Sequence, residues 1–194
     1  MLLLVGLGNP GSNYTNTRHN IGFKIIDAIN AHFKLSKQKP KFKGLLTTGN
    51  IDEKKIYAIK PLTFMNNSGT AIKELIDYFK IDAKDVFVFH DDLDIDFGKI
   101  KAKFGGSSAG HNGIESIDKF IGKDYSRIRV GIGKPKNDIE VADYVLQNFN
   151  EDEIVKIDNI IKNITDSISD LIDKKLDIEK VNIIKSLIYY TKEK

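Results

Sequence analysis

The sequence predicts an α/β fold: a single domain in which a twisted, mixed β-sheet is flanked by α-helices. Short apolar runs alternate along the chain with stretches whose apolar residues recur every three or four positions, which is typical of strands followed by helices. The 194 residues, 41% of them hydrophobic, suit one domain with a sizeable core. No repeat or linker divides the chain. We therefore expect one domain over residues 1–194, with the helices from about residue 151 packed on it.

The first half of the chain begins with a buried strand. Residues 2–5 are all apolar and are closed by Gly6, and a loop rich in glycine and asparagine follows to about Arg18. A basic loop is expected at 34–43. The other elements expected in this half are a helix at 21–33, strands at 45–51 and 55–59, and a helix at 71–79 capped by Asn67 or Ser68.

The second half predicts further alternation and a helical end. A strand at 86–89 leads directly into a polar loop that starts at His90, and a flexible loop at 105–110 precedes a helix. The expected elements are strands at 86–89, 100–104 and 127–132, a helix at 114–121, a long amphipathic helix at 154–171 and a last helix at 178–190.

The composition excludes several classes of site. The chain has no cysteine, which excludes disulfides, thiol nucleophiles and cysteine-based zinc sites and suits a reducing cytosol. The apolar stretch at the N-terminus is too short for a secretion signal or a membrane span. We therefore expect a cytoplasmic protein that does not bind membranes.

The charge distribution leaves two interpretations open. The net charge is only +3, but nine basic and three acidic residues lie between Phe97 and Asn137, and a second basic run lies at 34–43. A local positive field attracts phosphate groups. A solvated, lysine-rich surface would have the same composition.

Residues 6–11 match the G-x-G-x-x-G pattern after a strand, which raises the alternative of dinucleotide binding. In that motif a helix begins at once, so that a pyrophosphate meets the helix N-terminus. Here Pro10 disfavours the helical region for Asn9, and helical spacing resumes only near Ile21. The nearest acidic residue at the required spacing, Asp27, lies inside the predicted helix. A nucleotide-cofactor enzyme is therefore the weaker alternative.

Histidine, aspartate and asparagine gather in loops next to the predicted strands and helices. His19, His90 and His111 lie in such loops, whereas His32 ends a predicted helix. No serine-nucleophile, zinc-protease or P-loop motif is present. Hydrolysis without a metal or covalent nucleophile needs a histidine to deprotonate water, a carboxylate to orient that histidine, and neutral donors such as asparagine amides for the oxyanion. These loops contain all three residue types.

Six segments together resemble the bacterial peptidyl-tRNA hydrolase family, in family order and spacing over about residues 2–149. The segments are residues 5–11 (VGLGNPG), Tyr14 with 17–22 (TRHNIG), 60–69 (KPLTFMNNSG), 90–94 (HDDLD), 105–113 (GGSSAGHNG) and 127–135 (RIRVGIGKP). A C-terminal family motif is reduced here to Val181-Asn182. That departure, with the acidic balance of residues 151–194, weakens the case for a tRNA contact by the last helix.

The resemblance implies a role for each candidate residue. His19 is the general base that activates water, and Asp91 pairs with it. Asn9 lies beside the scissile ester and reads the peptide backbone, so that N-blocked aminoacyl-tRNA is accepted and the free form refused. The resemblance also implies a groove for the tRNA 3′ end and the peptide, lined by Tyr14, Phe64, Met65, Asn66 and Asn112. Asn66 and Asn112 are in addition the implied oxyanion donors. Lys101 and Arg129 are the implied clamp for a tRNA phosphate.

The implied reaction is hydrolysis of the ester that joins a peptide to the terminal ribose of tRNA, by a monomer that needs no metal or other cofactor. The loop at 105–110 and the C-terminal helices are expected to close the groove. Two rival functions are a non-catalytic RNA-binding protein and an amide-cleaving peptidase. The His19–Asp91 pair disfavours the first, and the absence of metal-ligand and nucleophile motifs disfavours the second.

Simpler structural roles stay open for several of these residues. They are a turn before Pro10 for Asn9, core aromatics for Tyr14 and Phe64, a helix cap for Asn112, and support of the strand end for His90.

Overall fold

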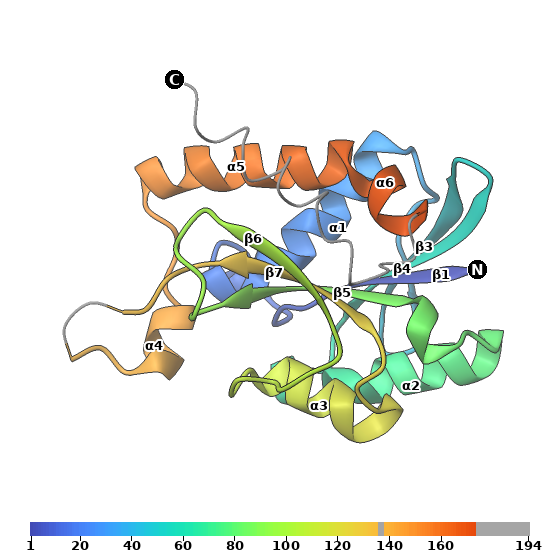
Figure 1. The fold of residues 1–194 in the computed structure, drawn as a ribbon, viewed down its shortest axis with the longest axis horizontal. Coiled ribbons are helices and arrows are strands. Elements are labelled where there is room, and N and C mark those ends of the chain that lie inside the picture. Colours follow the sequence, from blue (N-terminus) through green and yellow to red (C-terminus); the bar gives the residue numbers. More distant parts are fainter. Residues whose placement is uncertain (136–137, 174–194) are drawn as a thin grey trace.

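The structure is a computed structural model that describes residues 1–135 and 138–173. In these residues seven strands form one mixed sheet in the order β2-β3-β4-β1-β5-β7-β6 (Figure 1). The strands are β1 Leu2–Gly6, β2 Lys39–Lys41, β3 Gly44–Ile51, β4 Lys54–Pro61, β5 Val86–Asp92, β6 Ile100–Phe104 and β7 Ser126–Gly131. The central strands β4, β1, β5 and β7 pair in parallel, whereas the pairs β2–β3, β3–β4 and β6–β7 are antiparallel.

Helices cover both faces of the sheet. In Figure 1, α1, α5 and α6 lie on one face and α2 and α3 on the other. The α-helices are α1 Ile21–His32, α2 Ser68–Phe79, α3 Asn112–Ile121, α4 Val141–Val145, α5 Glu151–Asp166 and α6 Ile168–Asp173, and the 3₁₀ turns are η1 Ser12–Tyr14, η2 Arg18–Asn20, η3 Met65–Asn67 and η4 Ala83–Asp85.

Each face of β1 contributes to a different core cluster. Leu2 and Leu4 pack with residues of α1, α5 and α6, whereas Leu3 and Val5 pack with residues of α2 and α3. Successive side chains of a strand point to opposite faces, so a strand covered on both sides needs apolar residues at every position. This explains the continuous apolar run at the start of the chain.

Two predictions about the elements are wrong. The segment at 34–43 contains the edge strand β2, whose exposed lysines and proline are typical of a sheet edge and give no apolar signal. The single helix expected at 154–171 is two helices, α5 and α6, separated at Ser167. Apolar spacing continues across the break, which is why the sequence pattern does not reveal it. The helix expected at 178–190 lies outside the described residues.

Glycines bring the start of α1 against the sheet. A Cβ atom at Gly22 would lie 2.4 Å from the Phe89 carbonyl oxygen, and one at Gly6 would lie 2.2 Å from the Gly22 carbonyl oxygen. A Cβ at Gly8 would lie 2.7 Å from the ring of Phe23. The helix therefore packs directly on the ends of β1 and β5. Close packing thus explains why glycine is needed at Gly6 and Gly8, two positions of the G-x-G-x-x-G pattern, and nucleotide binding is not required to explain them.

Candidate active site

The candidate site lies at the carboxyl ends of three neighbouring parallel strands, β4, β1 and β5. Asn9 and His19 follow β1, Met65 follows β4, and Asp91 lies near the end of β5. Parallel strands end at the same edge of a sheet, so residues distant in sequence converge there. Asp91 is within the strand and not in a loop after it as predicted, because β7 pairs with β5 as far as Asp92.

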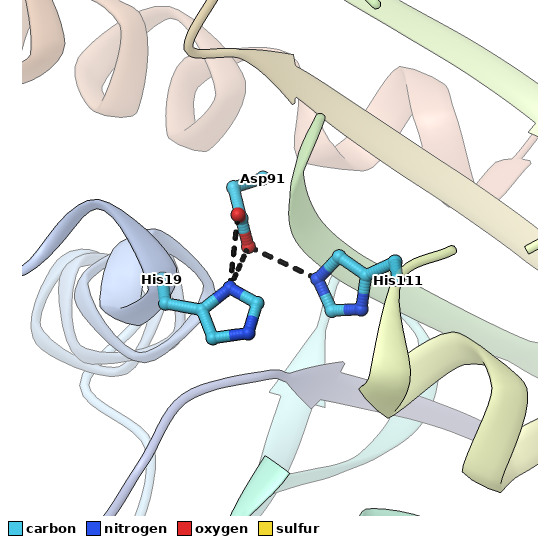
Figure 2. Close-up of side chains that lie close together, drawn as sticks. All are labelled: His19, Asp91 and His111. Carbon is cyan, nitrogen blue, oxygen red and sulfur yellow. Dashed lines mark hydrogen bonds and ion pairs between the residues drawn. The ribbon is translucent and has the colours of Figure 1, made fainter. Parts of the chain in front are cut away.

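The His19 and Asp91 side chains are in contact (Figure 2). Nδ1 of His19 lies 2.9 Å from both carboxylate oxygens of Asp91. Only 8% of His19 and 2% of Asp91 is exposed. Since η2 leads directly into α1, the close packing of that helix on the sheet holds His19 at this carboxylate.

His111 is the third member of the cluster, although no role was predicted for it. Its Nε2 lies 3.0 Å from Oδ1 of Asp91, and its ring centroid lies 4.9 Å from that of His19. Its Nδ1 accepts the backbone N–H groups of Gly113 and Ile114, at 3.1 and 3.3 Å. His111 is thus the N-cap of α3, and the alternative of Asn112 as the cap is wrong. The sequence indicated a helix start near His111-Asn112 but not which of the two caps it, and the contact with Asp91 depends on the tertiary fold.

The charges in the cluster favour an ionised Asp91. Burial tends to raise the pKa of Asp91, but the neighbouring His19 and His111 outweigh it and hold that pKa well below its usual range. Burial tends to lower the pKa of His19, but the charge and hydrogen bond of Asp91 raise it above its ordinary value. An ionised carboxylate only accepts hydrogen bonds, so Nδ1 of His19 carries a proton and Nε2 is the free base in the neutral ring.

His19, Asp91 and His111 also lie close enough together for a metal ion, with one ligand atom of each within 4.8 Å of the others. A metal on Nε2 of His111 would require the ring proton to move to Nδ1. That proton would then face two backbone N–H donors. The hydrogen bonds therefore favour proton transfer over metal binding as the chemistry of this cluster.

His90 is buried behind the cluster. It is 3% exposed, and its Nδ1 lies 2.6 Å from the carbonyl oxygen of Asp91. Burial, with the nearby His111, lowers the pKa of His90 well below its ordinary value, so this imidazole is neutral. These contacts agree with a structural role at the strand end.

Asn9 joins the loops that follow β1 and β4. Its side-chain Oδ1 accepts the backbone N–H of Met65 at 2.8 Å. Asn20 bonds both backbone groups of Asn9, with its Oδ1 2.8 Å from the Asn9 nitrogen and its Nδ2 3.0 Å from the Asn9 oxygen. A structural role in the turn before Pro10 therefore does not by itself account for the contacts of the Asn9 side chain. No acceptor among the described residues bonds the Asn9 Nδ2, which leaves that amide available to a substrate.

Phe64 and Tyr14 form an aromatic pair at the surface. Their rings meet edge to face with centroids 6.4 Å apart, and 54% of Phe64 is exposed. The core alternative is thus wrong for Phe64, whereas the next residue, Met65, is buried. Phe64 has a φ of 51°, a strained conformation for an aromatic residue. Such strain next to the Asn9 contact is typical of a functional site.

A cavity of about 410 Å³ opens beside the cluster. His19, Asp91 and His111 line it with Asn112 and loop residues 108–110. Its apolar wall is α4, which contributes Val141, Ala142 and Val145. Closure of the cavity by the long helix after residue 151, as predicted, is wrong, because α5 packs against α1 over the sheet. The other helix expected to close it, at 178–190, lies outside the described residues. Asn66 is exposed on η3, outside the set of described residues that line this cavity.

Lys101 and Arg129 lie opposite each other in the β6–β7 pair, which places both side chains on one face of the sheet. Arg129 is not free, since its Nε lies 2.7 Å from Oδ2 of Asp92. Other basic residues of the segment are also paired: Arg127 with Asp118, Lys99 with Asp96, and Lys134 with Asp94. The positive field is therefore weaker than the composition indicated. Lys101 is exposed and has no ion pair among the described residues.

Within residues 1–135 and 138–173, every helix is too short or too polar to span a lipid bilayer.

Comparison with known proteins identifies the family. Residues 3–188 match the family model described as Peptidyl-tRNA hydrolase. The chain is 72% identical to a peptidyl-tRNA hydrolase of Pelagibacter ubique (strain HTCC1062), with 92% of this chain and 96% of the relative covered. It is 46% identical to the Rickettsia typhi protein of the same description, with 95% and 100% covered. A crystal structure of peptidyl-tRNA hydrolase from Acinetobacter baumannii superposes with a TM-score of 0.86 at 34% identity, covering 91% of this chain and 90% of that one. The chain therefore belongs to the peptidyl-tRNA hydrolase family, enzymes that hydrolyse peptidyl-tRNA.

Proposed function

We propose that this chain hydrolyses the ester between a peptide and the 3′ end of tRNA, with His19 as the general base. The observation that carries the proposal is the contact of His19 Nδ1 with both oxygens of Asp91, 2.9 Å away. That contact fixes the tautomer and leaves Nε2 to accept a proton, and His19 lines the cavity beside it.

The reaction proceeds through addition of water to the ester carbonyl. Nε2 of His19 takes a proton from water as the hydroxide oxygen bonds to the carbonyl carbon, which gives a tetrahedral oxyanion. Asp91 stabilises the imidazolium that forms. When the intermediate collapses, the bond to the ribose oxygen breaks and the imidazolium returns its proton to that oxygen. The products are a peptide with a free carboxyl group and a tRNA with a free hydroxyl group.

Asparagine amides supply the neutral donors. Asn112 lines the cavity beside His19, which supports it as a donor to the oxyanion. Asn66 lies exposed on η3, which packs against α3, and is the second proposed donor. The unbonded amide of Asn9 suits a peptide carbonyl, which would discriminate against substrates with a free amino group. Tyr14 and Phe64 offer ring faces to the terminal base or peptide, next to the apolar contact of Met65.

The tRNA is held by phosphate contacts, and the enzyme acts as a cytoplasmic monomer that needs no metal or other cofactor. Lys101 and Arg129 share one face of the β6–β7 pair, which supports a clamp for one phosphate.

The test uses N-acetyl-aminoacyl-tRNA and the unblocked aminoacyl-tRNA, with EDTA present. We expect release only from the blocked substrate. His19→Ala should lower kcat by about 10²- to 10⁴-fold, the contribution of a general base. His32→Ala is the matched control, because His32 is exposed at the end of α1. Equal cleavage of both substrates would contradict the role of Asn9, and an active His19→Ala enzyme would contradict the mechanism.

A further inference from the structure

We propose that His111 is a positioning residue: by donating its Nε2–H to Asp91, it fixes that carboxylate and limits how strongly the carboxylate holds His19. The inference rests on the proposed function for its catalytic consequence, but the structural linkage can be tested without a substrate. His111 does not itself exchange protons with water or the ester in this scheme.

The tautomer of His111 follows from its partners. Backbone N–H groups can only donate, so Nδ1 of His111, which meets those of Gly113 and Ile114, must be an acceptor. In the neutral ring the proton then resides on Nε2, which points to Oδ1 of Asp91 at 3.0 Å (Figure 2). The start of α3 thereby determines which nitrogen of His111 faces the carboxylate.

Asp91 consequently divides one negative charge between two imidazoles. Oδ1 lies 2.9 Å from His19 Nδ1 and 3.0 Å from His111 Nε2. A carboxylate that already accepts one hydrogen bond is a weaker acceptor for a second N–H. If His111 were absent, Asp91 would hold the His19 proton more tightly. A general base works best when its pKa is near the working pH, so stronger pairing would leave less unprotonated His19 at neutral pH.

Other charged and titratable groups around His19 do not replace His111. His90, behind His111 on β5, bonds the Asp91 backbone. Asp92 is paired with Arg129 from β7, and Asp94 with Lys134. Titratable side chains on the helices near η2 are also bonded to partners other than His19. On α4, Tyr144 donates to the Ile132 carbonyl oxygen, and on α1, Asp27 pairs with Lys60 and Lys24 bonds Asn16. The neighbouring Arg18 pairs with Glu153 of α5.

The same hydrogen bonds place Asn112. His111 caps α3, and Asn112 is the first residue of that helix and lines the cavity. One imidazole therefore sets the position of the carboxylate behind the base and of an amide proposed to bind the oxyanion. A cap of the usual type, such as serine or aspartate, would hold the helix but would not donate to Asp91.

Two variants separate the contact with Asp91 from the cap. In His111→Asn the side-chain oxygen can take the place of Nδ1 and cap α3, but the side chain is too short to reach Asp91. In His111→Gln the amide nitrogen can take the place of Nε2 and donate to Asp91, but the acceptor for α3 is lost. The measurements are the pH profile of kcat/KM on N-acetyl-aminoacyl-tRNA, the separate kcat and KM, Tm, and NMR titration of the His19 ring without substrate.

For His111→Asn we expect the acid limb of the pH profile and the His19 titration to move to higher pH. We expect kcat at pH 7 to fall about tenfold, the effect of one hydrogen bond to a charged group, with KM changed less than about twofold. For His111→Gln we expect both titrations to stay near those of the wild type, with a lower Tm and a pH-independent fall in kcat, because the lost cap also positions Asn112. His32→Asn is the surface control and should alter none of these quantities.

A role of His111 in the cap alone predicts that His111→Asn behaves as the wild type in kcat, pH profile and His19 titration, and that only His111→Gln loses activity, together with Tm. That result, or an unmoved His19 titration in His111→Asn, would overturn the proposal. If the wild-type protein did not cleave the blocked substrate, the proposed function would fail, and the NMR titrations would still decide whether His111 controls His19.

Discussion

At the level of single residues, Asp91 determines the protonation state of His19, the proposed general base. It is 2% exposed, and both of its oxygens are hydrogen-bonded to imidazoles. An isolated charge at this depth would be costly, whereas one shared between two N–H donors is stabilised. The amount of unprotonated His19 at a given pH therefore depends on this carboxylate.

Replacing the carboxylate by its amide tests that dependence. In Asp91→Asn the charge that raises the pKa of His19 is lost, so the acid limb of kcat/KM should move to lower pH. The amide can also present its NH₂ group to Nδ1, which would favour the wrong tautomer. We expect kcat to fall at least about a hundredfold in a pH series on the blocked substrate. An acid limb that moved to higher pH would contradict this assignment.

The same pair gives stability and activity opposite dependences on pH. The pKa of His19 is raised in the folded state, so the charged pair contributes stability below the unfolded value of about 6.5, and this is lost as pH rises through the folded pKa. His19→Ala should therefore lower the free energy of unfolding more at pH 5.5 than at pH 9, measured by urea denaturation. Asp91 remains ionised between pH 5.5 and 9, so its own titration does not change the direction of this pH dependence of stability. A greater loss at pH 9 would contradict the raised pKa.

At the level of elements, the close packing of α1 on the sheet is the central contact. In Gly22→Ala the added methyl would lie 2.4 Å from the Phe89 carbonyl oxygen, so the helix must move outward. Overpacking of a tight contact costs about 1–3 kcal/mol. Because His19 directly precedes this helix, we expect a loss of kcat as well as of stability. Ala28→Gly, at a half-buried position on the same helix, is the control and should mainly lower stability.

The start of α5 is tied by an ion pair to Arg18, the residue before His19. Arg18 is 7% exposed, and its guanidinium donates to both carboxylate oxygens of Glu153, at 2.9 and 3.1 Å. The same glutamate completes the capping box of α5 with Asn150. Glu153→Ala would remove the half of the capping box in which Glu153 accepts the Asn150 backbone N–H, and would leave Arg18 without its carboxylate. We expect a loss of about 2–4 kcal/mol in urea unfolding.

The matched control for that variant is Glu151→Ala, because Glu151 is exposed in the same first turn of α5. Its effect should stay within about 0.5 kcal/mol, as for most surface substitutions. Equal losses in the two variants would show that the ion pair with Arg18 does not hold α5 in place.

At the level of the whole molecule, tRNA binding should depend on a few unpaired basic residues and not on the overall charge. Lys101→Ala should raise KM with little change in kcat, and reduce the slope of log(kcat/KM) against log salt by about 0.7–0.9, the value for one phosphate contact. Lys156→Ala, at an exposed position of α5, is the control and should change neither. An unchanged KM in Lys101→Ala would remove this residue from the tRNA footprint.

Local sequence patterns were enough to predict the class of fold and most of the elements. The apolar run at residues 2–5 predicts a strand that is buried on both faces, and the three- and four-residue spacing from Ile21 predicts α1; both agree with the structure. These signals are readable because they reflect local periodicity. The edge strand β2 and the break at Ser167 leave no periodic signal, so they could not be predicted.

The motifs pointed to His19 and Asp91, but how the two side chains meet depends on the folded chain. The two residues are 72 positions apart in sequence, and they meet because β1 and β5 end side by side and Gly22 lets α1 approach the sheet. Folding also brings His111 to the same carboxylate and pairs Arg129 with Asp92. Such contacts depend on distances across the sheet edge. A pattern along one chain carries residue types and spacing, whereas charge sharing and burial arise only when separate strands and loops pack together.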